Sequence, residues 1–185
     1  MAILPIVTYN DPFLRKKTKP VSNFNDDLSS FIANLFETMY NSEGVGLAAP
    51  QVGSSKSVFV IDVDNMVEDE QEESFGPLAF INPEIIEMGK TKIPMDEGCL
   101  SIPEVNDKVL RPVRIVITYT DQSFTERTQE FTGWNSRVIQ HEYDHLKGIL
   151  FIDYLSAFRK RMHKSALEEI DKGLRATTYP LKPKV

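Results

Sequence analysis

The sequence has only one cysteine, no long apolar run, and no basic stretch ahead of its first apolar residues. One cysteine excludes an internal disulfide framework. A membrane span needs about 20 consecutive apolar residues, and none of the runs approaches that length. Pro5 interrupts the apolar start of the chain, which therefore resembles neither a secretory signal nor a transit peptide. We expect a cytoplasmic protein that does not enter membranes.

The length of 185 residues, with 41% hydrophobic and 26% charged residues, is typical of one globular domain. We interpret residues 1–185 as that domain, with residues 156–185 as a basic C-terminal helix and tail. This end carries eight basic and three acidic residues, although the whole chain has a net charge of −6. Such an end is either a solvated helix face or a docking point for an anionic partner such as RNA. Residues 62–73 contain seven acids and no Lys or Arg, which predicts a surface loop.

Apolar spacing predicts the main elements. A seven-residue stripe with helical spacing runs from Leu28 to Tyr40, with Asn25 or Asp26 as its cap. A second helix is predicted over residues 134–145, ended by Gly148, and a third from Ser156 to about Lys172. Strands are predicted at residues 57–63, 79–82, 84–88, 92–94, 113–119 and 129–131. Helices and strands do not alternate regularly. We therefore expect an α+β fold, with a mixed or antiparallel sheet packed around the central helix and further helices near both ends.

The central helix contains a His-Glu-X-X-His sequence. His141 and His145 are four residues apart, so both imidazoles lie on one helix face and can bind a single metal ion. Glu142 is rotated by about 100° from His141, which places its carboxylate beside the position of a metal-bound water. The alternative is an ordinary amphipathic helix, because a five-residue pattern can occur by chance.

A catalytic metal site usually has three protein ligands and one open position. His163 falls in the basic C-terminal helix, where a surface position is the simpler interpretation. Cys99 is the better candidate for the third ligand. A lone cysteine is more often a small buried hydrophobe, but Gly98 beside it permits close backbone approach, and a metal would convert the thiol to a thiolate.

The segment from Gly44 to Gln51 is rich in glycine and alanine, so it can pass close to another backbone or to a ligand. A phosphate-binding loop is excluded, because the Lys-Ser/Thr ending and the following helix are missing. Gln51 supplies an amide donor at the end of the segment. A tight turn with Gln51 exposed is the alternative.

Together, the three segments resemble the signature motifs of the peptide deformylases. These motifs are G-X-G-X-A-A-X-Q at residues 44–51, E-G-C-X-S at 97–101 and Q-H-E-X-D-H-X-X-G at 140–148. Every defining position matches, in the family's order and at similar separations. Residues 11–16 and 152–156 also look like the family, so the resemblance covers most of the chain.

The resemblance implies an enzyme that hydrolyses the N-formyl group from the formyl-methionine of newly made proteins and releases formate. Cys99, His141 and His145 would bind one divalent ion, Fe2+ in most members, with Zn2+, Ni2+ or Co2+ able to occupy the site. A metal-bound water would attack the formyl carbonyl, with Glu142 as general base and then acid. N-formylmethionyl nascent peptides are thus the expected substrates. The ribosome is an expected partner through the basic C-terminal helix.

The resemblance also assigns oxyanion stabilisation to the Gln51 side chain and the backbone N–H of Leu100. Helix-face spacing adds an apolar pocket for the methionine side chain beside the metal. The substrate-binding residues that we expect are Gly44, Val45, Gly46, Met95, Glu97, Trp134, Arg137 and Val138. Arg111 is well placed to pair with Glu97.

Two alternatives belong to other classes. A different His-Glu-X-X-His metallopeptidase would take a third His or Glu ligand further along the chain, and His163 is the only histidine there, at an unsuitable spacing. A non-enzymatic interaction protein with the same fold would be expected to have lost Glu142 or a ligand, and none is lost.

Overall fold

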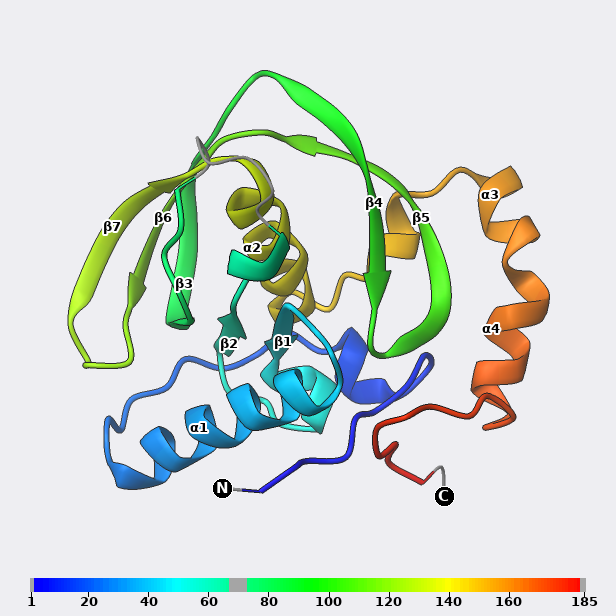
Figure 1. Ribbon diagram of the computed structural model, residues 1–185, viewed down its shortest axis with the longest axis horizontal. Coiled ribbons are helices and arrows are strands. Elements are labelled where there is room, and N and C mark those ends of the chain that lie inside the picture. The colour runs from blue at the N-terminus through cyan, green and yellow to red at the C-terminus, as the bar shows by residue number, and fades with distance from the viewer. Residues whose placement is uncertain (1, 67–72, 184–185) are drawn as a thin grey trace.

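The computed structural model describes residues 2–66 and 73–183 (Figure 1). The helices are α1 (Asp26–Asn41), α2 (Gly133–Leu146), α3 (Ala157–Met162) and α4 (Lys164–Asp171), with short 3-10 turns at Pro12–Arg15, Ala49–Val52, Asp64–Met66 and Phe151–Tyr154. The strands are β1 (Gly46–Ala48), β2 (Val58–Ile61), β3 (Leu78–Met88), β4 (Lys92–Cys99), β5 (Ile102–Pro112), β6 (Ile115–Thr120) and β7 (Glu126–Phe131). No helix in these two ranges is long and apolar enough to span a bilayer.

The strands form a five-stranded sheet in the order β1-β2-β3-β6-β7 and a separate hairpin of β4 and β5. Every pairing between these strands is antiparallel. Helix α2 lies between the large sheet and the hairpin, α1 crosses below β1 and β2, and α3 and α4 lie outside β5 (Figure 1). The expected α+β fold around the central helix is therefore confirmed.

Strand β2 explains why a helix covers each face of the sheet. Its four residues are all buried, and they alternate between two apolar clusters. Phe59 and Ile61 face the cluster that includes Val138 and Ile139 of α2. Val58 and Val60 face the cluster that α1 completes with Leu28, Ile32, Leu35 and Met39. A strand buried on both faces reads as a continuous apolar run, which is the pattern in the sequence.

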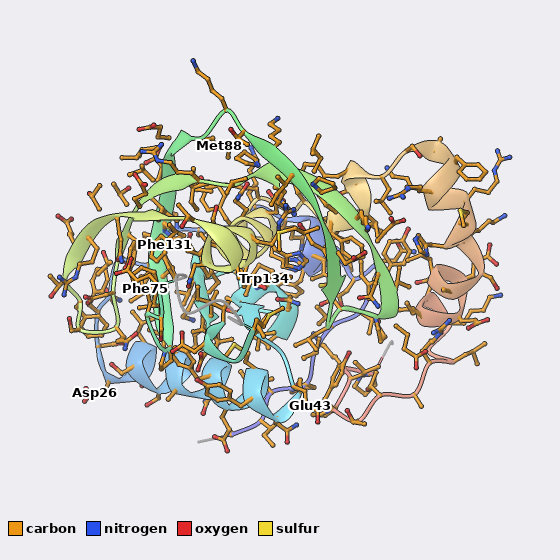
Figure 2. All side chains as sticks on the ribbon, turned by 45° about the horizontal axis from the view of Figure 1, so that its top comes forward. Asp26, Glu43, Phe75, Met88, Phe131 and Trp134 are labelled. Carbon is orange, nitrogen blue, oxygen red and sulfur yellow. The ribbon has the colours of Figure 1, made fainter. Side chains whose placement is uncertain are left out.

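Aromatic side chains fill the layer between the sheet and α2. Phe80 stacks on Phe59, with ring centroids 4.6 Å apart, and contacts Phe131 at 5.8 Å. Phe75 packs edge-on against Phe131 at 5.0 Å, and Figure 2 shows these two rings beside α2, with Trp134 on its first turn. These contacts fix the position of the helix that carries both histidines.

The helix ends follow the sequence signals. The Asn25 side chain accepts a hydrogen bond from the Leu28 N–H and caps α1, as expected. Helix α2 ends before Gly148, whose φ of 76° is a left-handed conformation suited to glycine. A Cβ at Gly148 would also lie 2.6 Å from the Arg15 carbonyl oxygen, so glycine is required there for two reasons.

The predicted break between the strands at residues 79–82 and 84–88, where Pro83 stands, is wrong. Strand β3 continues from Leu78 to Met88, because the proline sits where the register with β6 shifts between Ile81 and Glu84. A proline has no N–H to donate, and a bulge is where a strand tolerates that loss. The acidic segment predicted as a surface loop lies partly outside the described residues, so this remains a prediction for residues 67–72.

The single C-terminal helix predicted from Ser156 to Lys172 is two helices. Ser156 caps α3 as expected, but the helix is interrupted at His163, whose Nε2 lies 2.8 Å from Asp107 on β5. Leu167 and Ile170 of α4 are buried in a third cluster against the hairpin. The break allows the second helix to turn its apolar face onto β5, a requirement that helical periodicity alone does not reveal.

Asn82, next to the buried proline, gives a test of how the sheet is held. Its φ is 50°, and its amide donates to the Val21 carbonyl at 2.8 Å and accepts from the Val21 N–H at 2.7 Å. Replacing Asn82 by Ala removes both hydrogen bonds. The alanine must still adopt the left-handed backbone conformation, which is strained for any residue with a Cβ. We expect a loss of about 2–4 kcal/mol in the free energy of unfolding, measured by urea titration.

The control for this prediction is Asn82→Gly. It loses the same two hydrogen bonds but adopts the left-handed backbone without strain, so it should be less destabilised than Asn82→Ala by up to about 1 kcal/mol. Wild-type stability in Asn82→Ala would show that the Val21 contact contributes nothing.

Candidate metal centre

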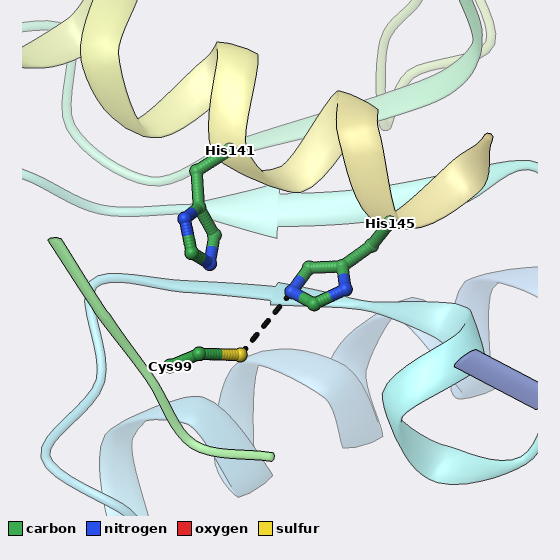
Figure 3. Close-up of side chains that lie close together, drawn as sticks. All are labelled: Cys99, His141 and His145. Atoms are coloured by element: carbon green, nitrogen blue, oxygen red, sulfur yellow. Dashed lines mark hydrogen bonds between the residues drawn. The ribbon is translucent and has the colours of Figure 1, made fainter. Parts of the chain in front are cut away.

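Three side chains from two parts of the chain converge beside α2. Cys99 ends β4, and His141 and His145 lie one turn apart on the helix face turned toward it (Figure 3). The Cys99 Sγ is 3.3 Å from His145 Nε2, and one ligand atom from each of the three residues lies within 4.8 Å of the others. This is the set predicted from sequence.

The donor set fits a divalent metal ion. A thiolate and two imidazoles leave one position open in a tetrahedral site, the arrangement of catalytic rather than structural centres. His145 is buried, and burial lowers its pKa well below the usual value, which favours the neutral ring that a metal ligand must have.

Glu97 orients the other histidine. Its Oε2 lies 3.0 Å from His141 Nδ1, which leaves the Nε2 of that ring for the ion. The carboxylate also accepts two hydrogen bonds from Arg111, at 2.6 and 2.9 Å, as the sequence predicted, and one from Arg137 at 2.8 Å. Burial alone would raise the pKa of Glu97, but the hydrogen bonds from His141 and Arg111 outweigh it and hold the pKa far below the usual range.

The network continues behind the helix. Arg111 donates to Asp144 at 2.6 Å, and the Tyr154 hydroxyl donates to the same carboxylate oxygen at 2.9 Å. The Arg111 guanidinium also lies over the Tyr154 ring, 4.7 Å from its centroid. Asp144, between the two histidines in sequence, therefore anchors α2 to β5 and to the turn that contains Tyr154.

Glu142 is buried beside the ligands. Burial raises the pKa of its carboxyl to about 7, and its Oε2 has no hydrogen-bond partner among the described residues. Gly46 of β1 lies against this side chain, since a Cβ there would be 2.4 Å from Glu142 Oε1. Gly46 of the motif at residues 44–51 is thus required because Glu142 of the motif at residues 140–148 lies against it.

The side chain of Gln51 also reaches the site of Cys99, His141 and His145. Its Oε1 accepts from the Ala48 N–H at 2.8 Å, which turns the amide nitrogen toward the turn after Cys99. The Nε2 donates to Ser101 Oγ at 3.3 Å and to the Cys99 sulfur at 3.5 Å. Gln51 is therefore buried and directed at the site, and the alternative of an exposed turn residue is wrong.

A cavity of about 730 Å3 opens onto the metal centre. The predicted residues that line it are Gly44, Val45, Gly46, Gln51, Glu97, Cys99, Leu100, Trp134, Arg137, Val138, His141 and Glu142. Met95 does not line it, because it lies two residues, or about 7 Å, up the strand from Glu97. Arg137 borders the cavity, but its guanidinium donates to Glu97 and to the carbonyls of Ile93 and Val109.

Part of the cavity wall has no sequence signal. The hairpin residues Ile102 to Asn106 and the C-terminal residues Ala176 to Tyr179 line it as well. Neither stretch was predicted to line the cavity. Residues 102–106 directly follow the Cys99 motif but carry no motif of their own, and residues 176–179 reach the cavity only through long-range folding. His163, by contrast, contacts Asp107 and is not one of the grouped ligands, as expected.

Comparison with known proteins gives one consistent result. The family model described as polypeptide deformylase matches residues 3–161. A peptide deformylase from Salinibacter ruber is 47% identical over 97% of this chain and 94% of its own length. A crystal structure of peptide deformylase from Ehrlichia chaffeensis has a TM-score of 0.85 and 36% identity, covering 93% of this chain and 97% of its own. One from Thermotoga maritima has a TM-score of 0.77 and 43% identity, covering 84% and 99%.

Cysteine labelling tests the ligand assignment, because Cys99 is the single thiol of the chain. We expect iodoacetamide to label Cys99 slowly in the metal-loaded native protein and quickly after chelation, because a coordinated thiolate is shielded from the reagent. Mass spectrometry counts the added group, and unfolded protein gives the full-labelling control. Equal rates with and without chelator would contradict the assignment.

Proposed function

The chain belongs to the peptide deformylase family and removes the N-formyl group from nascent peptides, and we propose that Cys99, His141 and His145 hold the metal ion of this hydrolase. The observation that carries the proposal is the convergence of these three side chains beside a buried carboxylate with a free oxygen. When bound, the ion supplies a Lewis acid that lowers the pKa of water from 15.7 toward roughly 7.

We assign Glu142 as the general base and then the general acid. Its Oε2 is buried without a partner in the described part of the chain, and a carboxyl with a pKa near 7 can both take and return a proton at neutral pH. In this assignment the carboxylate removes the proton of the attacking water and passes it to the leaving amine. The products are formate and a free α-amino group.

We assign the Gln51 amide and the backbone N–H of Leu100 to the oxygen of the formyl group, where negative charge grows. The Gln51 nitrogen is already turned toward the turn that contains Leu100, because the Ala48 N–H holds its oxygen. Donors fixed in this way need no reorganisation during the reaction. Each is worth on the order of 10²- to 10³-fold in rate.

The methionine side chain is proposed to enter the apolar part of the cavity. Val45 and Val138 form its walls and Trp134 borders it, all three within the cavity lining. Glu97 and Arg137 support this space from behind, because their charged groups are used in contacts with each other and with the backbone.

Fe2+ is the proposed native ion, with Zn2+, Ni2+ or Co2+ able to replace it. A thiolate and two imidazoles suit iron and zinc alike, so the ligands themselves do not select between them. The ion is identified by metal analysis of protein purified without oxygen.

The alternative of another metallopeptidase is not favoured. Such an enzyme would use a third His or Glu beyond His145, but His163 is directed at Asp107, and the similar proteins are peptide deformylases.

We further propose that the C-terminal helices contact the ribosome in the cytoplasm, where nascent chains appear. Arg159 is paired with Asp107, Arg15 with Asp153 and Lys164 with Glu168. Lys160, Arg161, Lys164 and Arg15 border a groove of about 500 Å3, which Asp153, Glu168 and Asp171 line as well. These side chains are oriented toward solvent, as binding to anionic RNA requires.

Replacing Glu142 by Gln tests the catalytic assignment. Glutamine keeps the size of the side chain but cannot accept a proton, so we expect retained metal and a turnover at least about 10²-fold lower on a formyl-methionyl peptide. Formate release is the measurement. Glu84→Gln on the exposed part of β3 is the matched control and should retain full activity. Turnover of Glu142→Gln within a few-fold of wild type would remove Glu142 from this role.

A charge reversal tests ribosome contact without exposing the core. Truncation would uncover Leu167 and Ile170, so Lys160→Glu combined with Arg161→Glu is the better variant. We expect weaker binding to ribosomes at low salt and a salt slope reduced by about 1 to 2, because two phosphate contacts are lost. The control is the double variant Lys90→Glu with Lys92→Glu. These two lysines are also exposed and lie far in sequence from the C-terminal helices. Equal binding by both variants would contradict the docking surface.

A further inference from the structure

The C-terminal segment forms part of the cavity wall. Ala176, Thr177, Thr178 and Tyr179 line the same 730 Å3 cavity as the metal ligands. The family model ends at residue 161, so this wall lies outside the segment that the family model matches. Nothing in the motifs of the sequence connects residues 176–179 with the metal centre.

The segment is fixed to the body of the protein at both ends. On one side, Arg175 donates to Glu104 of β5 and to Glu169 of α4. On the other, the Ile6 N–H donates to the Pro180 carbonyl at 2.9 Å, and the Lys182 N–H donates to the Ile6 carbonyl at 2.8 Å. Residues 176–179 are therefore held in place by contacts with the rest of the fold.

Tyr179 makes the contact that matters most for chemistry. Its hydroxyl donates to the carbonyl of Leu100 at 2.8 Å, while its ring packs against the apolar cluster between α1 and the large sheet. Burial raises the pKa of Tyr179 to about 12, so the hydroxyl keeps its proton at neutral pH and remains a donor.

Leu100 is held from three directions. Its side chain lies close to Gly44, where a Cβ would be 2.9 Å from Leu100 Cδ1. The next residue, Ser101, is bonded through its carbonyl to the Tyr9 N–H at 2.8 Å and through its hydroxyl to Gln51. The Tyr179 hydroxyl fixes the carbonyl of Leu100 itself, and this carbonyl is linked to the N–H of the same residue through only two backbone torsions.

We propose that Tyr179 is a positioning residue that aims the Leu100 N–H at the reacting carbonyl, and that residues 176–179 are the wall against which the peptide after the formyl-methionine lies. The proposal rests on the function assigned to Leu100 above. A cavity of this volume exceeds what one methionine side chain fills, so the wall of residues 176–179 has further residues of the substrate to contact.

The first test is Tyr179→Phe in the metal-loaded enzyme. The ring and its packing remain, and one hydrogen bond to Leu100 is lost. We expect kcat on a formyl-methionyl tripeptide to fall about 10-fold, less than the 10²–10³-fold for losing an oxyanion donor outright, with KM within two-fold. Metal content and melting temperature should match wild type.

Tyr119→Phe is the matched control. It also removes a tyrosine hydroxyl that donates a hydrogen bond, to Gln129 on the large sheet, away from the cavity. Its kcat should be unchanged. A Tyr179→Phe enzyme with wild-type kcat would overturn the positioning role, and equal losses in the two variants would show a general effect of losing a hydroxyl.

The second test is Thr178→Trp, which adds bulk at the wall. We expect KM for the tripeptide to rise at least about 5-fold with kcat within two-fold, the opposite pattern to Tyr179→Phe, while formyl-methionine amide is hydrolysed normally. An unchanged KM for the tripeptide would overturn the wall. Wild-type enzyme that released no formate would instead contradict the assigned function, so the two failures are distinguishable.

Discussion

The buried carboxylate of Glu97 is the interaction on which the site depends. It lies on β4, its two guanidinium partners lie on β5 and α2, and its third partner is the ring of His141. Removing a carboxylate from water costs several kcal/mol unless charged partners and hydrogen bonds compensate, and here they occupy both oxygens. The fold therefore cannot separate the hairpin from α2 without leaving a charge unpaired. The same contacts that join these elements also set which nitrogen of His141 faces the ion.

The edge of the large sheet and the turn after it provide the other half of the site through uncharged groups. Gly46 on β1 lies against Glu142, and the side chain of Gln51 reaches over the turn after Cys99. Both come from a segment that lies beneath α2 on the edge of the sheet. The proposed metal ligands and the proposed base are thus fixed between a rigid sheet and a hairpin held by ion pairs, which is the preorganisation that electrostatic catalysis requires.

The local features were predictable from the sequence, because each depends on neighbours in the chain. Helix α1 follows from its apolar stripe and Asn25 cap, and the spacing of His141 and His145 follows from the helical repeat. Features that depend on distant contacts were not predictable. Strand β5 carries Asn106, Asp107 and Lys108, which are poor strand formers, and it is held by pairing with β4. The passage of β3 through Pro83 depends on Asn82 and Val21, 61 residues apart, and Tyr179 reaches Leu100 over 79 residues.

The pairing of Ile6 with residues 180–182 has a consequence for the order of folding. It is a parallel bridge that joins two points about 170 residues apart, and closing a loop of that length costs about 4–5 kcal/mol of chain entropy. So distant a contact forms only after the sheet and helices have already brought the two segments together. During synthesis, Ile6 can form this bridge only after residues 180–182 have emerged. The wall that carries Tyr179 is therefore completed later than the hairpin and α2, and a growing chain brings Cys99, His141 and His145 together before its cavity is finished.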